Sequence, residues 1–105
     1  MVNELVTLDS EVVISNDVVS RELEGEAVIL NLASGTYFGL DPVGTRIWSL
    51  VQEDGSLRRV FEILQQEYDV TPRRLEGDIL RLVEVLCANG LLRVAPLQER
   101  LTARA

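Results

Sequence analysis

The chain has 105 residues, a hydrophobic fraction of 47% and a formal net charge of -7. A chain of this length is expected to fold as one domain and to bury roughly two-thirds of its unfolded surface. With no histidine and a single cysteine, it lacks the commonest general base and cannot form an internal disulfide. These features argue against an enzyme, a resident cofactor and a metal centre, and the negative charge argues against a nucleic-acid partner.

Neither a membrane segment nor a secretion signal is expected. No apolar run approaches the roughly 20 residues that span a bilayer. Residues 1–10, MVNELVTLDS, lack the basic start and apolar centre of a signal peptide. A cytoplasmic protein with no membrane partner is therefore expected.

The N-terminal part predicts short strands. Residues 1–10 show no clear period and are expected to form an N-terminal extension. Residues 11–15 alternate in polarity and predict a strand, whereas residues 18–24 fit either a strand or a crossing loop. The sequence does not decide between these two structures for residues 18–24, and residues 11–15 are taken as the first strand.

Residues 26–32 and 36–40 predict a β-hairpin around the turn Ala33-Ser34-Gly35. Gly35 suits its left-handed position because a residue without Cβ reaches positive φ at no steric cost. The apolar residues 28–32 are expected to belong to the core. Together with residues 11–15, the hairpin makes three strands before any helix.

Three helices follow, each preceded by a capping residue. Asp41 and Thr71 stand before prolines that suit the first helical position, and Ser56 can cap the helix between them. Gly90 is expected to end the last helix. The predicted helices cover about residues 42–52, 57–68 and 72–89.

Helical spacing assigns an inward face to each of these helices. In the last helix the apolar arc is wide, which indicates a second contact or a partner. The apolar residues Leu91, Leu92 and Val94 are expected to pack back on the helices, and residues 95–105 to form a C-terminal tail. Core positions expected by this spacing are Val43, Ile47, Leu50, Val51, Leu75, Ile79, Leu82 and Leu86, with Trp48 buried and its N–H bonded to a carbonyl.

The predicted fold class is α+β: a winged helix-turn-helix-like arrangement with a three-stranded antiparallel sheet followed by three helices.

Three stretches of the sequence carry a family resemblance. They are VILNLASGTYFGLDPVGTRIW, VFEILQQEYD and the set Asp78, Ile79, Leu82, Leu86, Gly90, Leu91 and Leu92. Together they resemble the PqqD-like family, whose members are called RiPP recognition elements. The form GTYFGLDPVGTRIW is most similar to the stand-alone B1 proteins of lasso-peptide clusters. The resemblance covers residues 11–94, which are therefore expected to form a PqqD-like leader-recognition domain.

The resemblance implies non-catalytic binding of the leader segment of a ribosomally synthesised precursor peptide. In the family the leader adds as an antiparallel strand to the third strand and lies against the third helix. The implied partners are a separate leader peptidase, a transglutaminase-like cysteine protease, and possibly a cyclase. The implied peptide-binding residues are Thr36, Tyr37, Phe38, Gly39 and Leu40 on the strand, and Asp78, Ile79, Arg81, Leu82 and Val85 on the helix.

The residues also permit simpler interpretations. Phe38 and Leu40 can pack inward with Tyr37 half covered by a helix, and Asp78 can serve the helix dipole rather than a peptide. Two other functions stay open: a winged-helix DNA-binding regulator, and a PqqD-like peptide chaperone of another peptide-modification or cofactor pathway. The DNA-binding alternative is weakened because acidic side chains dilute the arginines of the last helix.

Overall fold

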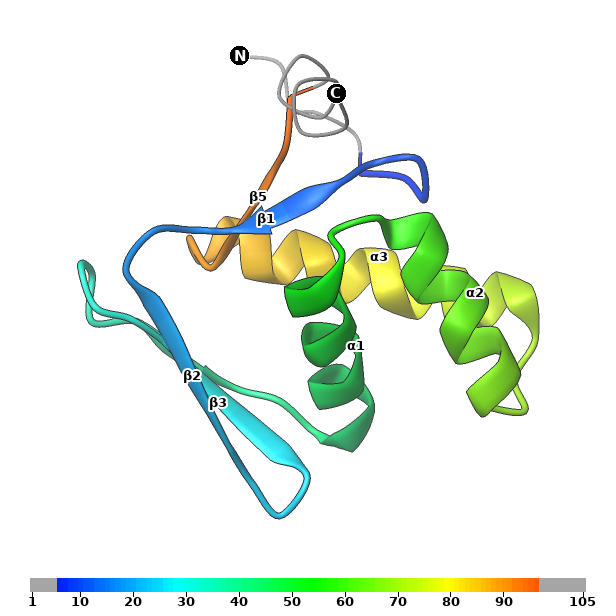
Figure 1. The fold of residues 1–105 in the computed structure, drawn as a ribbon, viewed down its shortest axis with the longest axis horizontal. Helices are drawn as coiled ribbons and strands as arrows, with labels where there is room; N and C mark the ends of the chain where they lie inside the picture. The colour runs from blue at the N-terminus through cyan, green and yellow to red at the C-terminus, as the bar shows by residue number, and fades with distance from the viewer. Residues whose placement is uncertain (1–5, 97–105) are drawn as a thin grey trace.

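The computed structural model describes residues 6–96, in which a small sheet packs against a group of helices (Figure 1). The elements and their bounds are β1 (Val12–Ile14), β2 (Val18–Leu23), β3 (Glu26–Asn31), β4 (Tyr37–Gly39), α1 (Pro42–Glu53), α2 (Leu57–Glu67), α3 (Pro72–Ala88) and β5 (Leu92–Val94).

The main sheet has three antiparallel strands in the order β2-β3-β4, so the predicted fold class is confirmed. Its first strand is not the expected one. The segment that fitted either a strand or a loop forms β2, and residues 12–14 instead form β1, which pairs with β5 in a separate two-stranded sheet. Residues 92–94, which include the apolar Leu92 and Val94, thus form a strand rather than a tail that only packs on helices. This pairing joins segments about 80 residues apart, a distance at which local patterns carry no information.

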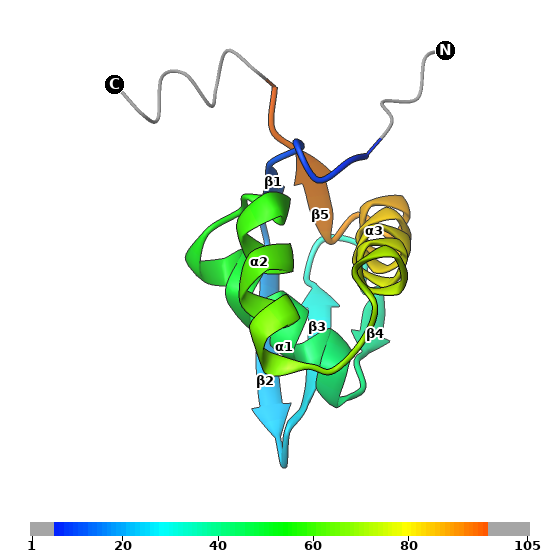
Figure 2. The ribbon, with the colours of Figure 1, turned by 90° about the vertical axis from the view of Figure 1, so that its right-hand side faces the viewer.

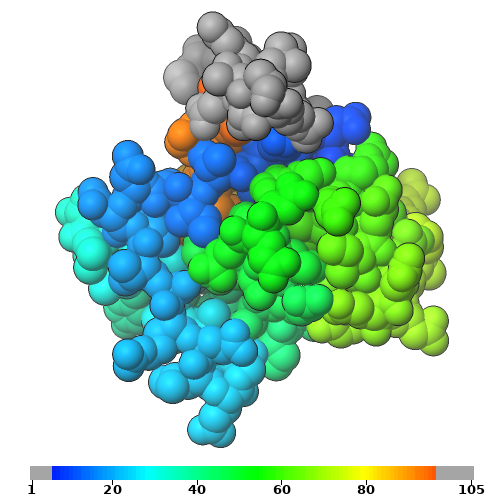
Figure 3. Space-filling view, viewed as in Figure 1, coloured from blue at the N-terminus to red at the C-terminus, as the bar shows by residue number. Residues whose placement is uncertain are grey.

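A tight turn joins β2 to β3. Glu24 and Gly25 both have positive φ, at 55° and 81°, as a two-residue type I′ hairpin turn requires. Its twist matches that of the flanking strands. The end of this hairpin extends beyond the helices and projects from the body of the molecule (Figure 3).

The buried face of β3 consists of Ala27 and Ile29, which are almost fully covered. The amide of Ala27 donates to Thr45 Oγ1 of α1 at 2.8 Å, which fixes this face toward the helices. Val28 and Leu32 lie on the other face and are 45% and 60% exposed. The expectation that residues 28–32 are core was therefore wrong for these two side chains.

The predicted helix caps are present. Asp41 Oδ1 accepts from the amide of Gly44 at 2.8 Å, Ser56 caps α2, and Thr71 caps α3. Gly90 has φ of 74° and follows α3, as expected of a left-handed stop. These starts and stops are determined by local chemistry, which explains why the sequence located them.

Most core positions of the helices agree with prediction. Two differ, because Val43 is 40% exposed and Leu82 is only partly buried. Trp48 is buried as expected, but its Nε1 donates to the hydroxyl of Ser20 on β2 at 3.1 Å and not to a carbonyl. The confirmed core positions are Ile47, Leu50, Val51, Leu75, Ile79 and Leu86.

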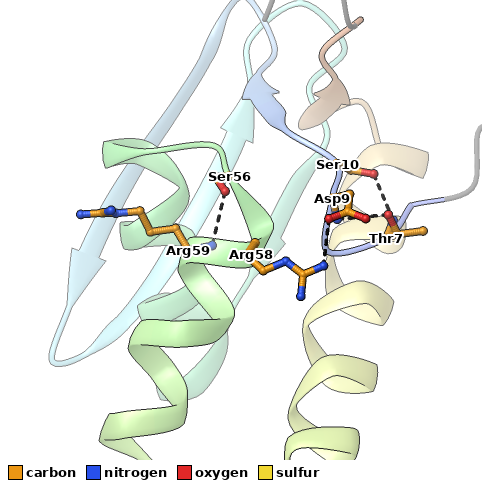
Figure 4. A network of polar contacts seen from close by, with 6 residues as sticks. All are labelled: Thr7, Asp9, Ser10, Ser56, Arg58 and Arg59. Atoms are coloured by element: carbon orange, nitrogen blue, oxygen red, sulfur yellow. Dashed lines mark hydrogen bonds and ion pairs between the residues drawn. The ribbon is translucent and has the colours of Figure 1, made fainter. Parts of the chain in front are cut away.

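Residues 6–10 pack on the helices. Val6 and Leu8 are buried, and Asp9 Oδ1 accepts a 2.8 Å bond from Arg58 at the start of α2 (Figure 4). The core thus includes side chains that precede the predicted boundary at residue 11. Residues 1–5 and most of the predicted tail, residues 97–105, lie outside the described part of the chain.

Candidate functional site

Strand β4 is an edge of the three-stranded sheet. The amide of Leu40 donates to the carbonyl of Ala27 at 2.8 Å, and antiparallel pairing directs every second residue to the same neighbour. Phe38 therefore bonds to β3, whereas the main-chain groups of Tyr37 and Gly39 point away from it. Among residues 6–96 no strand pairs with this outer side. The edge can accept a further strand.

A cleft of about 520 Å³ lies between β4, the first turn of α1 and helix α3. Figure 2, in which α3 is seen nearly end-on, shows α3 on the β4 side of the sheet. The lining is mainly apolar and comes from segments far apart in the sequence. The lining residues are Phe38, Gly39, Leu40, Asp41, Val43, Gly44, Ile47, Asp78 and Leu82.

The structure brings together part of the predicted peptide-binding set at this cleft. Phe38, Gly39 and Leu40 line it from the strand, and Asp78 and Leu82 line it from α3. Phe38 is partly buried and Leu40 is buried, so the inward packing weighed for both side chains is also present.

The remaining predicted residues do not line the cleft. Tyr37 is 74% exposed on the outer face of the sheet, not half covered by a helix. Thr36 is partly buried just before β4, and Arg81 and Val85 are exposed on α3. Ile79 is fully buried and belongs to the core. Contact with a peptide is thus open to all of these except Ile79.

The sequence prediction omitted the wall that α1 contributes. Val43 and Ile47 are one helical turn apart and both face the cleft, and Gly44 lies between them. A Cβ on Gly44 would lie only 3.2 Å from Asp41 Oδ1 and 3.3 Å from Leu40 Cδ2. Glycine at this position therefore lets the side chains of Leu40 and Asp41 lie close to the backbone of α1. Helical periodicity assigned Val43 to the core, and no sequence signal distinguished it from a core residue; its 40% exposure is known only from the structure.

The carboxylates at the cleft already have partners. Asp78 Oδ1 accepts a 2.7 Å bond from Arg81 Nη2, and its Oδ2 lies 3.8 Å from Arg74 Nε. Asp41 is held by its cap bond to Gly44. Pairing with Asp78 also lowers the positive charge that Arg74 and Arg81 present to a phosphate backbone, which further disfavours DNA binding by α3.

Other potentially reactive groups do not assemble at the cleft. Burial raises the pKa of the Cys87 thiol, and the nearby Glu84 charge raises it further, so the thiolate is disfavoured. Within the described ranges, no group of three or more His, Cys, Asp or Glu residues is placed to hold a metal ion. No helix there has the length and apolar character needed to cross a membrane.

The fold and cleft define an α+β domain with an open sheet edge beside a helix, the arrangement used by domains that bind extended peptides through strand addition. The chain belongs to the PqqD family, because the family described as coenzyme PQQ synthesis protein D (PqqD) matches residues 26–92. This match confirms the family resemblance.

Two solved structures share the fold. "TbiB1 in Complex with the TbiA(beta) Leader Peptide" is 40% identical, covers 76% of this chain and 93% of its own, and has a TM-score of 0.73. "Lasso peptide synthetase B1 complexed with the leader peptide" is 26% identical, covers 79% of this chain and 98% of its own, and has a TM-score of 0.72. No curated protein matches the chain at a significant level.

Proposed function

We propose that this protein binds the leader segment of a lasso-type precursor peptide, without catalysing a reaction, by accepting the leader as an added strand on β4. The observation that carries the proposal is the open β4 edge beside the apolar cleft. The similar B1 structures, both complexes with leader peptides, support the same ligand class.

The geometry suggests how the leader is held. The outward main-chain groups of Tyr37 and Gly39 bond to the leader backbone and supply affinity that depends little on sequence. Leader side chains alternate, so those on one face enter the cleft against Leu40, Val43 and Leu82, where apolar groups are selected. The cleft volume of about 520 Å³ falls within the roughly 300–1,000 Å³ typical of ligand sites.

Bound leader would then be presented to a leader peptidase of the transglutaminase-like cysteine protease type, and possibly to a cyclase, in the cytoplasm. The outer face of the sheet offers a surface for such a partner, because its exposed apolar side chains form a patch opposite the helices. The exposed residues on this side are Val19, Leu23, Val28, Leu32 and Tyr37.

Fluorescence polarisation with a labelled synthetic leader, taken from the precursor encoded beside this chain's gene, tests the proposal. We expect saturable binding, with the largest amide shift changes in NMR spectra at Tyr37 and Gly39. Absence of binding at roughly tens of micromolar peptide, which corresponds to about -6 kcal/mol, would contradict leader binding. A parallel titration with duplex DNA at low salt tests the regulator alternative, for which binding would have to be tight and salt-sensitive.

A further inference from the structure

Asn31, the last residue of β3, joins the loop that leads to β4 to the residue pair that follows α3, so it links the elements that carry two walls of the cleft. Its Oδ1 accepts bonds from the amides of Ala33 at 2.9 Å and Ser34 at 3.2 Å, both in the loop that leads to β4. Its Nδ2 donates to the carbonyl of Gly90, just after α3, at 3.0 Å. One side chain thus holds both the hairpin that carries β4 and the end of α3.

The acceptor at Gly90 is itself held firmly. The amide of Gly90 donates to the Cys87 carbonyl at 3.1 Å, and the amide of Leu91 donates to the Leu86 carbonyl at 2.9 Å. These bonds close the last turn of α3. A Cβ on Gly90 would lie 3.6 Å from Asn31 Nδ2, so the two segments are in direct contact.

Elsewhere the walls are supported through different neighbours. Strand β4 is paired with β3 and continues into α1 through the Asp41 cap, whereas α3 packs against α2 and β5. Among the side-chain hydrogen bonds found within residues 6–96, the one from Asn31 to Gly90 joins the three-stranded sheet to the end of α3. Phe38 and Leu40 of the sheet side and Leu82 of α3 face one another only across the cleft.

We propose that Asn31 is a positioning residue that sets the separation of β4 and α3 before the leader arrives. The inference rests on the proposed leader binding. A leader that bonds to β4 and packs on α3 fits only when both walls are at the right distance. If the walls fluctuate, only a fraction of the molecules is competent and the observed Kd rises by the inverse of that fraction.

Asn31→Asp isolates this role from the one in the hairpin loop. The carboxylate can still accept from the Ala33 and Ser34 amides, but it cannot donate to Gly90. It also places negative charge at the C-terminal end of α3, where the helix dipole disfavours it. The bond between the walls is therefore replaced by repulsion, with almost no change in side-chain shape.

Asn89→Asp is the matched control. Asn89 Nδ2 donates to the Val85 carbonyl at 2.8 Å, so this variant loses an amide donor and gains a charge at the same helix end. Asn89 makes no hydrogen bond to the sheet among those found in the described part of the chain. A general effect of charge on α3 would appear in both variants, whereas loss of wall positioning would appear in Asn31→Asp alone.

Stopped-flow binding with the same labelled synthetic leader separates positioning from direct contact. We expect Asn31→Asp to lower the association rate constant about tenfold, with dissociation changed by less than about twofold, because fewer molecules are competent at any moment. Asn89→Asp should leave both rate constants within about twofold of wild type. Asn31→Ser, which is too short to reach Gly90 but retains an acceptor for the loop, should slow association if Asn31→Asp fails to fold.

Equal association rate constants in wild type, Asn31→Asp and Asn31→Ser would overturn the positioning role. A higher dissociation rate constant with an unchanged association rate constant would also overturn it, because that pattern would indicate direct contact between Asn31 and the peptide. Failure of the wild-type protein to bind would overturn the proposed function, and this inference with it. Wild-type binding with unaltered association in the variants would overturn only the inference.

Discussion

The two edges of the three-stranded sheet differ in what lies beside them. Strand β2 is six residues long and β4 only three, so β2 is the longer template for an added strand. The amide of Leu32 donates to the Asp17 carbonyl at 2.7 Å, which by alternation turns the main chain of Val18, Ser20 and Glu22 outward. Yet β4, not β2, lines the cleft. The proposed peptide site therefore lies at the shorter edge, because that edge has a second wall beside it.

The side chains of the two edges support this distinction. Strand β2 carries Arg21 and Glu22, and charged residues on an edge strand disfavour non-specific pairing with strands of other chains. Strand β4 has the sequence Tyr-Phe-Gly and carries no charge. The edge next to the cleft is thus open to a partner, while the longer edge is protected.

The largest effect should come from charging the cleft. Val43→Asp places a carboxylate in its apolar lining and should raise the leader Kd about thirtyfold, or ~2 kcal/mol, because a buried unpaired charge is costly. Folding should be spared, since residue 43 is 40% exposed and an acidic residue suits a first helical turn. Fluorescence polarisation measures the change.

Val70→Asp is the control for that charge. Val70 is also 40% exposed but does not line the cleft, so its variant should bind leader within about twofold of wild type. Equal losses in the two variants would show that net charge, and not the cleft, determines affinity.

The comparison of edges can be tested directly with proline, which removes a main-chain donor. Gly39→Pro deletes an outward N–H of β4 and should weaken leader binding about tenfold, since one bond and its geometry are lost. Glu22→Pro deletes an outward N–H of β2 and should leave affinity unchanged. Isothermal titration calorimetry of both variants shows which sheet edge binds the leader. A larger loss of affinity in Glu22→Pro than in Gly39→Pro would assign the leader to β2.

Predicted side chains that do not line the cleft should contribute less. Tyr37→Ala and Val85→Glu should each weaken binding about three- to fivefold, because each removes or repels a peripheral contact. Both positions are exposed, so Tm should shift by less than about 2 °C. Unfolding of both variants in thermal scans would instead make these residues structural and place the site elsewhere.

The smallest effect concerns an ion pair outside the cleft. Arg46 bonds to Glu67 through Nε at 3.0 Å and Nη2 at 2.6 Å, and this bond lowers the pKa of the Glu67 carboxyl. A lowered folded-state pKa adds stability that is present above the unfolded carboxyl pKa and lost as pH falls through the folded one. The Arg46→Met variant should therefore melt slightly lower at neutral pH.

That difference should vanish in acid, where Glu67 is protonated in both proteins. Thermal scans by circular dichroism at neutral and acidic pH measure it. Leader affinity should not change, because neither residue lines the cleft. A tenfold change in affinity, ~1.4 kcal/mol, would mean that the packing of α1 on α2 controls the cleft.

Much of the fold was predictable because its signals are local. The caps at Asp41, Ser56 and Thr71 and the stop at Gly90 fix helix ends through bonds within a few residues. The pairing of β1 with β5 was missed because it joins distant segments. Residues 18–24 stayed open between a strand and a loop because charged residues interrupt the apolar pattern of β2, whose side chains are mostly exposed.

The candidate site was only partly predictable. Family resemblance suggested Phe38, Leu40 and Leu82 as site residues, and these do line one cleft. It did not suggest Val43, because an apolar residue at helical spacing carries the same pattern whether it faces the core or a partner. Nor did it suggest Asn31, whose bond to Gly90 spans 59 positions.

The sequence by itself determined where the helices begin and end, the hairpin that carries β4, and the family. Only the tertiary structure decided which face of β3 is buried, because Val28 and Ile29 are both aliphatic and a period of two does not say which side meets the helices. It likewise decided that β4 rather than β2 lies beside α3. That choice depends on how the layers pack, and no local pattern encodes it.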